Sequence, residues 1–140
     1  MRKKVFIVFI VSFILIQFYP VDRNNLVTQP ELEIQASEEV IAILEKSCYD
    51  CHSNKVRYPF YSYIAPVSWL VSQDVKEGRE KLNFSEWGNL SDRKKRRKAE
   101  DSFEEIEHEY MPLPIYLYLH SDAVISAEDA AVIEDWSENF

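Results

Sequence analysis

The 140-residue chain is 46% hydrophobic and 14% aromatic, has a formal net charge of −8, and contains two glycines and two cysteines. This length suits one domain, and the apolar fraction excludes a disordered chain. The few glycines argue against an all-β fold with its many tight turns. Two cysteines cannot form a multi-disulfide scaffold, and the acidity argues against a nucleic-acid partner. Together these limits predict a small, acidic, all-α protein.

Residues 1–20 have the pattern of a signal anchor or transmembrane helix. Three basic residues at positions 2–4 precede an apolar run over 5–18, which is short for a span of about 20 residues. Since no small-x-small cleavage site follows, an uncleaved anchor is favoured over a cleaved signal peptide. The positive-inside rule then places the rest of the chain outside the cytoplasm. We therefore expect a single-pass cell-membrane protein with a periplasmic or extracytoplasmic domain.

The segment 21–36 is polar, contains a proline and lacks sustained periodicity, which predicts a linker before a domain over 37–140. Ser37 is a good N-cap for a first helix that runs directly into Cys48. A second helix is expected over about 66–82, where apolar residues share one face; they are Val67, Leu70, Val71 and Val75.

Two further helices complete the expected domain. The third begins near Ser91 and ends at Met111, because Pro112 disfavours helical backbone in the residue before it. Its apolar residues Ala99, Phe103, Ile106 and Tyr110 recur at spacings of four, three and four, which is typical of a helix. The last begins at Ser126, which forms a capping box with Asp129. In this helix Val132, Ile133 and Trp136 form one face. The segment 58–63 is left unassigned, and most of the nearby aromatic residues are expected in the core: Tyr58, Phe60, Tyr61, Tyr63, Trp69 and Trp87.

The sequence Cys48-Tyr49-Asp50-Cys51-His52 matches the C-x-x-C-H pattern of c-type haem attachment. Two thiols three positions apart can form thioethers with the two vinyl groups on one edge of a porphyrin. The adjacent histidine then lies under the ring and presents a nitrogen to the iron. Because covalent attachment reduces the need for a large hydrophobic pocket, the motif suits a small domain. It predicts one covalent haem c held by Cys48, Cys51 and His52.

Three other interpretations of the motif stay open. A structural disulfide is possible in an exported protein, but it gives His52 no role. A thioredoxin-like redox pair requires a βαβ setting, which the helical pattern does not provide. A zinc site could use both cysteines with two of His52, His108 and His120, although the usual paired spacing of the second pair is missing.

The second axial ligand of the iron is expected to be Met111. Methionine or a second histidine is a common choice, and apart from Met1 this is the chain's one methionine. It lies on a loop, since Pro112 ends the preceding helix. His120 is the runner-up, His108 is interpreted as a surface residue, and an open five-coordinate iron is the third possibility.

Charged residues outside the motif give weaker indications of partner docking and of haem binding. The basic run 93–98 is interpreted as the solvated start of a helix, with a docking patch for an acidic redox partner or anionic lipid as the alternative. Arg57 and Arg79 are candidates for pairing with haem propionates.

Beyond this motif, the chain resembles the small haem-binding domain of exported bacterial cytochrome-c-like proteins. The similarity spans residues 37–136 and includes the segments 47–54, 58–61, 64–69, 77–79, 83–87, 111–113, Tyr116, 119–120, 125–126 and Trp136. Where a smaller residue such as glycine is expected before Met111, this chain has Tyr110. The resemblance implies a small cytochrome-c-like helical domain around one covalent haem, with His52 as proximal and Met111 as distal ligand.

These features predict a membrane-tethered monohaem electron-transfer module that is not an enzyme. Its redox partner is an unidentified protein, the membrane contact is the N-terminal helix, and neither a nucleic acid nor a small-molecule substrate is indicated. The alternatives are a haem peroxidase or gas sensor with an open or labile sixth site, and a disulfide- or zinc-stabilised interaction domain. Coordination state separates the haem alternatives, because transfer favours a six-coordinate low-spin iron.

Overall fold

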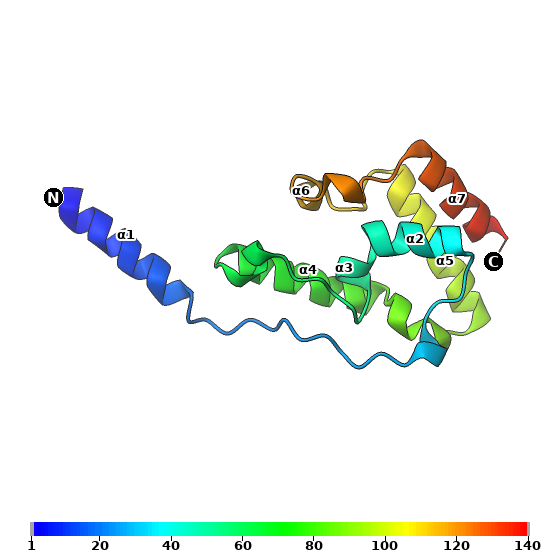
Figure 1. The fold of residues 1–140 in the computed structure, drawn as a ribbon, viewed down its shortest axis with the longest axis horizontal. Helices are drawn as coiled ribbons and strands as arrows, with labels where there is room; N and C mark the ends of the chain where they lie inside the picture. Colours follow the sequence, from blue (N-terminus) through cyan, green and yellow to red (C-terminus); the bar gives the residue numbers. More distant parts are fainter. Residues whose placement is uncertain (1, 140) are drawn as a thin grey trace.

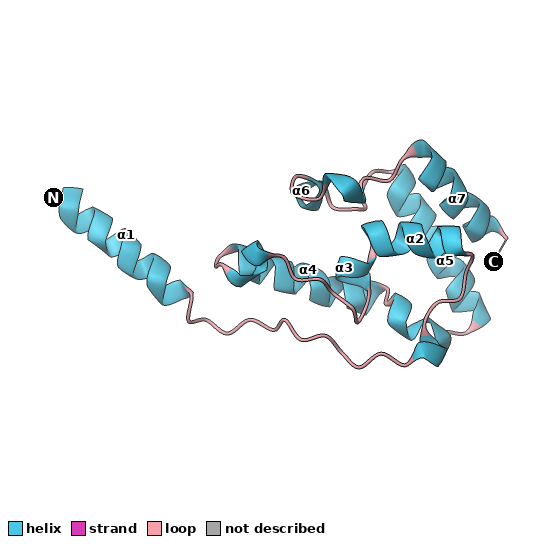
Figure 2. Cartoon of the chain, viewed as in Figure 1, coloured by secondary structure: helices cyan, strands magenta, loops and turns pink. Residues whose placement is uncertain are grey.

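The computed structural model describes residues 2–139, and every regular element in that range is a helix (Figures 1 and 2). The α-helices are α1 (Arg2–Ile16), α2 (Glu38–Ser47), α3 (Tyr49–His52), α4 (Val67–Lys81), α5 (Asp92–Glu107), α6 (Pro114–Leu117) and α7 (Ala127–Glu138). The 3-10 helices are η1 (Pro30–Leu32), η2 (Phe60–Tyr63), η3 (Phe84–Asn89) and η4 (Ser121–Ala123). The predicted all-α fold is therefore confirmed.

The helices begin where the capping residues predict. The Ser37 side chain accepts a hydrogen bond from the backbone N–H of Val40 at the start of α2. Ser126 and Asp129 form a reciprocal capping box at the start of α7. These bonds satisfy N–H groups that have no partner within the helix. The helix predicted over 66–82 is α4, within one residue at each end.

One core holds the domain together. It is formed by apolar side chains from the segment before α2, from α2, α3, η3, α5 and α7: Ile34, Val40, Ile43, Leu44, Tyr49, Phe84, Trp87, Ala99 and Ile133. The Phe84 ring stacks between the rings of Tyr49 and Trp87, with centroid distances of 5.7 and 6.0 Å. Because α3 contributes Tyr49 to this stack, the C-x-x-C-H motif is fixed to the core.

Two of the predicted apolar helix faces are only partly buried. On α5, Ala99 is buried and Phe103 and Ile106 are half-buried, but Tyr110 is exposed. The helix ends at Glu107 rather than Met111, so Tyr110 lies beyond it. Of the aromatic residues expected in the core, Trp87 is buried whereas Phe60, Tyr63 and Trp69 are exposed, and so are Val67 and Leu70 of α4. The expectation of burial is wrong for Phe60, Tyr63 and Trp69. Tyr19 contacts Trp69 and Arg23 lies over the Tyr63 ring, but these contacts leave the rings exposed.

The helix α1 projects away from the domain (Figure 1), and all its residues from Arg2 to Leu15 are exposed. Among the helices of residues 2–139, none combines the length and apolar character needed to cross a membrane. The transmembrane helix expected in residues 1–20 stays a prediction.

The segment 21–36 has no helix except η1, and it runs along the domain instead of hanging free (Figure 1). Asn25 exchanges hydrogen bonds with the backbone of Val56, and the backbone N–H of Ile34 donates to the carbonyl of Phe84. Ile34 itself is in the core. The end of this segment therefore contributes to the packed domain.

An ion pair joins α2 to α7. The Lys46 ammonium lies 2.7 Å from the Asp129 carboxylate, with Lys46 35% and Asp129 24% exposed. The hydrogen bond from Lys46, together with the backbone N–H of Ser126, lowers the pKa of Asp129. A carboxyl group whose pKa is lowered by folding stabilises the folded state at pH values above the pKa of the unfolded chain. This contribution disappears as the pH falls through the pKa of the folded state.

The variant Lys46→Met is therefore expected to lower the free energy of unfolding by about 0.5 kcal/mol at neutral pH, a value discounted for solvent screening. As the pH falls through the lowered pKa of Asp129 in the folded state, the difference should shrink, because Asp129 becomes protonated in both states. Urea unfolding at neutral pH and at a pH below that folded pKa measures this. Lys76→Met, whose ion pair with Glu80 is long and exposed, is the control. An equal loss at both pH values would assign the effect to packing.

Candidate haem site

The C-x-x-C-H motif forms one wall of a cavity of about 620 Å³, here called the central cavity. This volume lies within the roughly 300–1,000 Å³ of ligand pockets in proteins. The walls come from α2 and α3, the second half of α4, α5, and the segment that joins α5 to α6. Lining residues include Cys48, Cys51, His52, Gly78, Leu82, Phe84, Ile106, Met111, Leu113 and Tyr116. The predicted site residues Cys48, Cys51, His52 and Met111 thus share one cavity.

The one-turn helix α3 positions both thiols and the imidazole. Cys48 ends α2, and its carbonyl accepts hydrogen bonds from the backbone N–H groups of Cys51 (3.1 Å) and His52 (2.9 Å). This turn places all three residues on the cavity wall. Neither cysteine is in a disulfide. Burial, as the largest cause, raises the pKa of each thiol to about 12, so both are protonated at neutral pH.

His52 is oriented by the backbone of α4's end. Its Nδ1 lies 3.0 Å from the carbonyl oxygen of Leu82, and since a carbonyl only accepts, Nδ1 is the protonated nitrogen. Nε2 then carries a free lone pair, with which it can bind a metal. Burial, the largest cause, lowers the pKa of His52. The imidazole is therefore neutral at pH 7, which is the form that binds a metal.

Met111 enters the cavity from the loop after α5. The chain reverses at Glu109, whose φ of 57° lies in the left-handed region. The backbone N–H groups of Tyr110 and Met111 both donate to the carbonyl of Glu105, at 2.9 and 3.1 Å. These bonds fold the loop back over the helix end and bring half-buried Met111 to the cavity.

The runner-up ligand His120 is engaged elsewhere. Its Nε2 and the Tyr61 hydroxyl form a hydrogen bond of 2.6 Å, and its ring stacks on Tyr116 with a centroid distance of 4.1 Å. It does not line the central cavity. His108 is exposed, and its ring stacks on Tyr110, in agreement with its interpretation as a surface residue.

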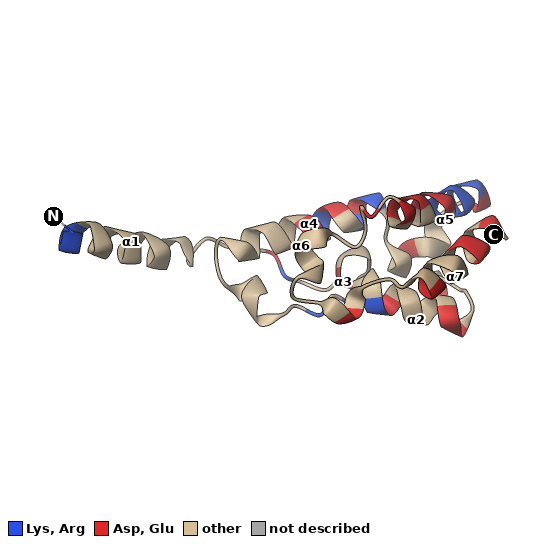
Figure 3. Ribbon diagram, turned by 90° about the horizontal axis from the view of Figure 1, so that it is seen from above, with Lys and Arg blue, Asp and Glu red and all other residues tan. Residues whose placement is uncertain are grey.

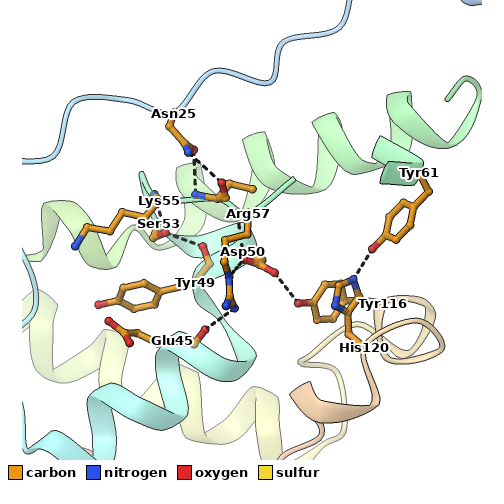
Figure 4. A network of polar contacts seen from close by, with 11 residues as sticks. Asn25, Glu45, Tyr49, Asp50, Ser53, Lys55, Arg57, Tyr61, Tyr116 and His120 are labelled. Atoms are coloured by element: carbon orange, nitrogen blue, oxygen red, sulfur yellow. Dashed lines mark hydrogen bonds and ion pairs between the residues drawn. The ribbon is translucent and has the colours of Figure 1, made fainter. Parts of the chain in front are cut away.

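A chain of polar contacts ties the α6 segment to the motif (Figure 4). The Tyr116 hydroxyl donates to the Asp50 carboxylate at 2.9 Å, and Asp50 also pairs with Arg57 at 3.3 Å. Burial and the neighbouring Asp50 raise the pKa of Tyr116, which keeps its proton on the hydroxyl. Neither Asp50 nor Tyr116 was assigned a site role from the sequence. Asp50 lies inside the motif itself, which was the available signal.

The two arginines that were proposed to pair with haem propionates have other partners in the structure. Arg57 pairs with Asp50, and the Arg79 Nε donates to the Ser53 carbonyl at 2.8 Å. Neither lines the cavity, whereas Lys81 and Lys98 do. Lys98 also pairs with Asp101 at 3.2 Å. The cations available to acidic groups in the cavity are therefore these lysines.

Gly78 allows α4 to pack directly against the motif. A Cβ at this position would lie 2.8 Å from the Cys51 carbonyl oxygen and 3.2 Å from the Cys51 Cβ. The variant Gly78→Ala must therefore push α3 away from α4. We expect a net loss of about 1–2 kcal/mol of stability, because overpacking costs about 1–3 kcal/mol and alanine returns up to about 1 in helix propensity.

Urea unfolding of Gly78→Ala checks this estimate, with Glu80→Ala at an exposed position of the same helix as the control. The displacement of Cys51 should also reduce the fraction of chains that carry haem. A Gly78→Ala protein that is as stable as the wild type would show that the close contact is not rigid.

The cavity residues fit a haem group. A neutral, oriented imidazole, two free thiols and a thioether meet in a mainly apolar space. The Ser47 hydroxyl, which also lines the cavity, is buried and has no hydrogen-bond partner within the described chain. Residues 2–139 contain no group of three or more histidine, cysteine or acidic residues arranged to hold a metal ion. The group of two cysteines and two histidines that the zinc interpretation needs is therefore not found among these residues.

Comparison with known proteins agrees with this chemistry. The model of a protein family described as "Haem-binding domain" matches residues 11–139. The chain therefore belongs to this haem-binding domain family. No curated protein and no solved structure matches the chain.

Proposed function

We propose that this member of the haem-binding domain family carries one c-type haem and serves as a one-electron carrier. The observation behind this proposal is that Cys48, Cys51, His52 and Met111 line a single cavity. In this proposal the two thiols form the thioethers, His52 is the proximal ligand, and Met111 is the distal ligand. The bound haem supplies one-electron redox chemistry.

The protein's own residues would hold and tune that group. The Leu82 carbonyl fixes the tautomer and ring orientation of His52. The bonds to the Glu105 carbonyl hold the loop that carries Met111. A methionine ligand favours the reduced iron and raises the potential. Lys81 and Lys98, the basic residues at the cavity, would pair with the propionates.

We also propose that the N-terminal segment tethers the domain to the outer face of the cytoplasmic membrane. Its basic start and the exposed apolar surface of α1 support this. Cations at the start of an apolar segment favour retention of that end in the cytoplasm. The domain would then lie on the periplasmic or extracytoplasmic side, where c-type haem is attached.

The electron-carrier function is tested by purifying the protein from cells equipped for c-type haem maturation. The expected result is a low-spin, six-coordinate spectrum in both oxidation states, a reversible one-electron titration, and no rapid binding of carbon monoxide. A high-spin ferrous form that binds carbon monoxide at once would contradict electron transfer and favour the peroxidase or gas-sensor alternative.

A further inference from the structure

Apolar side chains are exposed together where η2 meets the start of α4. Phe60 is 78%, Tyr63 59% and Leu70 56% exposed, and Ile64 and Val67 are exposed beside them. We call these five residues the η2–α4 patch. The apolar face of α4 continues along the helix, but it is buried only at Val75. Exposed apolar residues that cluster in this way mark contact sites for an apolar partner.

The patch lies next to the end of α1. The Gln17 side chain makes two hydrogen bonds with the backbone of Ala65, donating to its carbonyl at 3.2 Å and accepting from its N–H at 2.9 Å. The Tyr19 ring makes an edge contact with Trp69, with a centroid distance of 5.7 Å. The patch is therefore continuous with the apolar surface that α1 exposes.

Charged residues are absent from both segments that form this surface. No acidic or basic residue occurs in 5–21 or in 58–73, and Figure 3 shows this end of the molecule without charged groups apart from the start of α1 and a few neighbours. Arg23, whose guanidinium lies 4.7 Å from the centre of the Tyr63 ring, borders the patch. The basic first half of α5 lies at the opposite end (Figure 3).

We propose that the η2–α4 patch contacts the phospholipid bilayer beside α1. This inference rests on the proposed membrane tether and extends it, since α1 alone would leave the domain free to rotate. Tyrosine and tryptophan favour the membrane–water interface, and an arginine at the border suits the headgroup region. Because the contact is apolar, it does not require anionic lipid. With the patch against the bilayer, the basic first half of α5 faces away from the membrane, toward soluble partners.

The test uses the full-length haem protein in phosphatidylcholine vesicles that contain a photoactivatable phosphatidylcholine. After illumination, mass spectrometry locates the labelled peptides. We expect label in residues 2–18 and in 58–73, and background label in 24–36 and 92–108. In the double variant Phe60→Ser, Leu70→Ser, label in 58–73 should fall roughly fivefold or more because the apolar contact area is lost, while label in 2–18 persists.

The matched control is Leu26→Ser, Val27→Ser, which removes two exposed apolar side chains from the extended segment and should leave both signals unchanged. Retention of haem by each variant reports that the fold is intact. Label in 2–18 alone would overturn the patch and leave the tether standing. Label in neither segment would overturn both. An undiminished 58–73 signal in the Phe60, Leu70 variant would overturn the assignment of the contact to the patch.

Discussion

The double variant Cys48→Ala, Cys51→Ala is expected to lose all covalent haem, since the chain contains no other cysteine to form a thioether. The fold itself should persist, because Tyr49 stays in its stack with Phe84 and the α3 turn is held by backbone hydrogen bonds. Haem staining after denaturing electrophoresis, with intact-protein mass, measures the attachment.

Two single variants make this prediction sharper. Cys48→Ala and Cys51→Ala should each be able to retain one thioether, so haem staining should be reduced in amount but still present. Ser47→Ala, which removes the neighbouring cavity hydroxyl and leaves both thiols, should stain like the wild type. Haem that stays on the double variant through denaturation would show that attachment does not use these thiols.

The variant Met111→Ala is expected to keep its covalent haem but lose its distal ligand. The small side chain cannot reach the iron, and no other methionine is available in the domain. Since a thioether ligand raises the potential, the midpoint potential should fall. The ferrous form should become high-spin and bind carbon monoxide. Redox titration and absorption spectra before and after carbon monoxide measure both changes.

Leu113→Ala and His120→Ala are the controls for this variant. Leu113 lines the cavity on the same loop without a donor atom, and His120 is hydrogen-bonded to Tyr61 outside the cavity. Both should retain the wild-type spectrum. If Met111→Ala leaves spectrum and potential unchanged while His120→Ala alters them, then the distal ligand is His120.

The parts of the fold that the sequence predicted are those set by local interactions. Ser37 and Ser126 mark helix starts through side-chain bonds only three residues long. The apolar residues of α4 and α7 also predict helices from local sequence, because they recur three or four positions apart. The haem motif is equally local, because one turn of helix brings Cys48, Cys51 and His52 together.

Features that depend on contacts distant in sequence were missed. Tyr116 reaches Asp50 across 66 positions, and Arg79 bonds to Ser53 rather than facing the cavity. Aromatic composition suggested burial for Phe60 and Tyr63, but burial depends on what packs over them. The helix α6 has only four residues, too few for a periodic pattern, and Pro114 at its start was its main local sign.

The proposed function depends first on covalent attachment of haem at Cys48 and Cys51. The reduced pyridine haemochrome spectrum of the purified, acid-acetone-extracted protein tests this attachment. We expect a c-type spectrum from haem that stays with the polypeptide. A colourless protein from cells shown to mature another c-type cytochrome, or a b-type spectrum from haem that passes into the solvent, would contradict it.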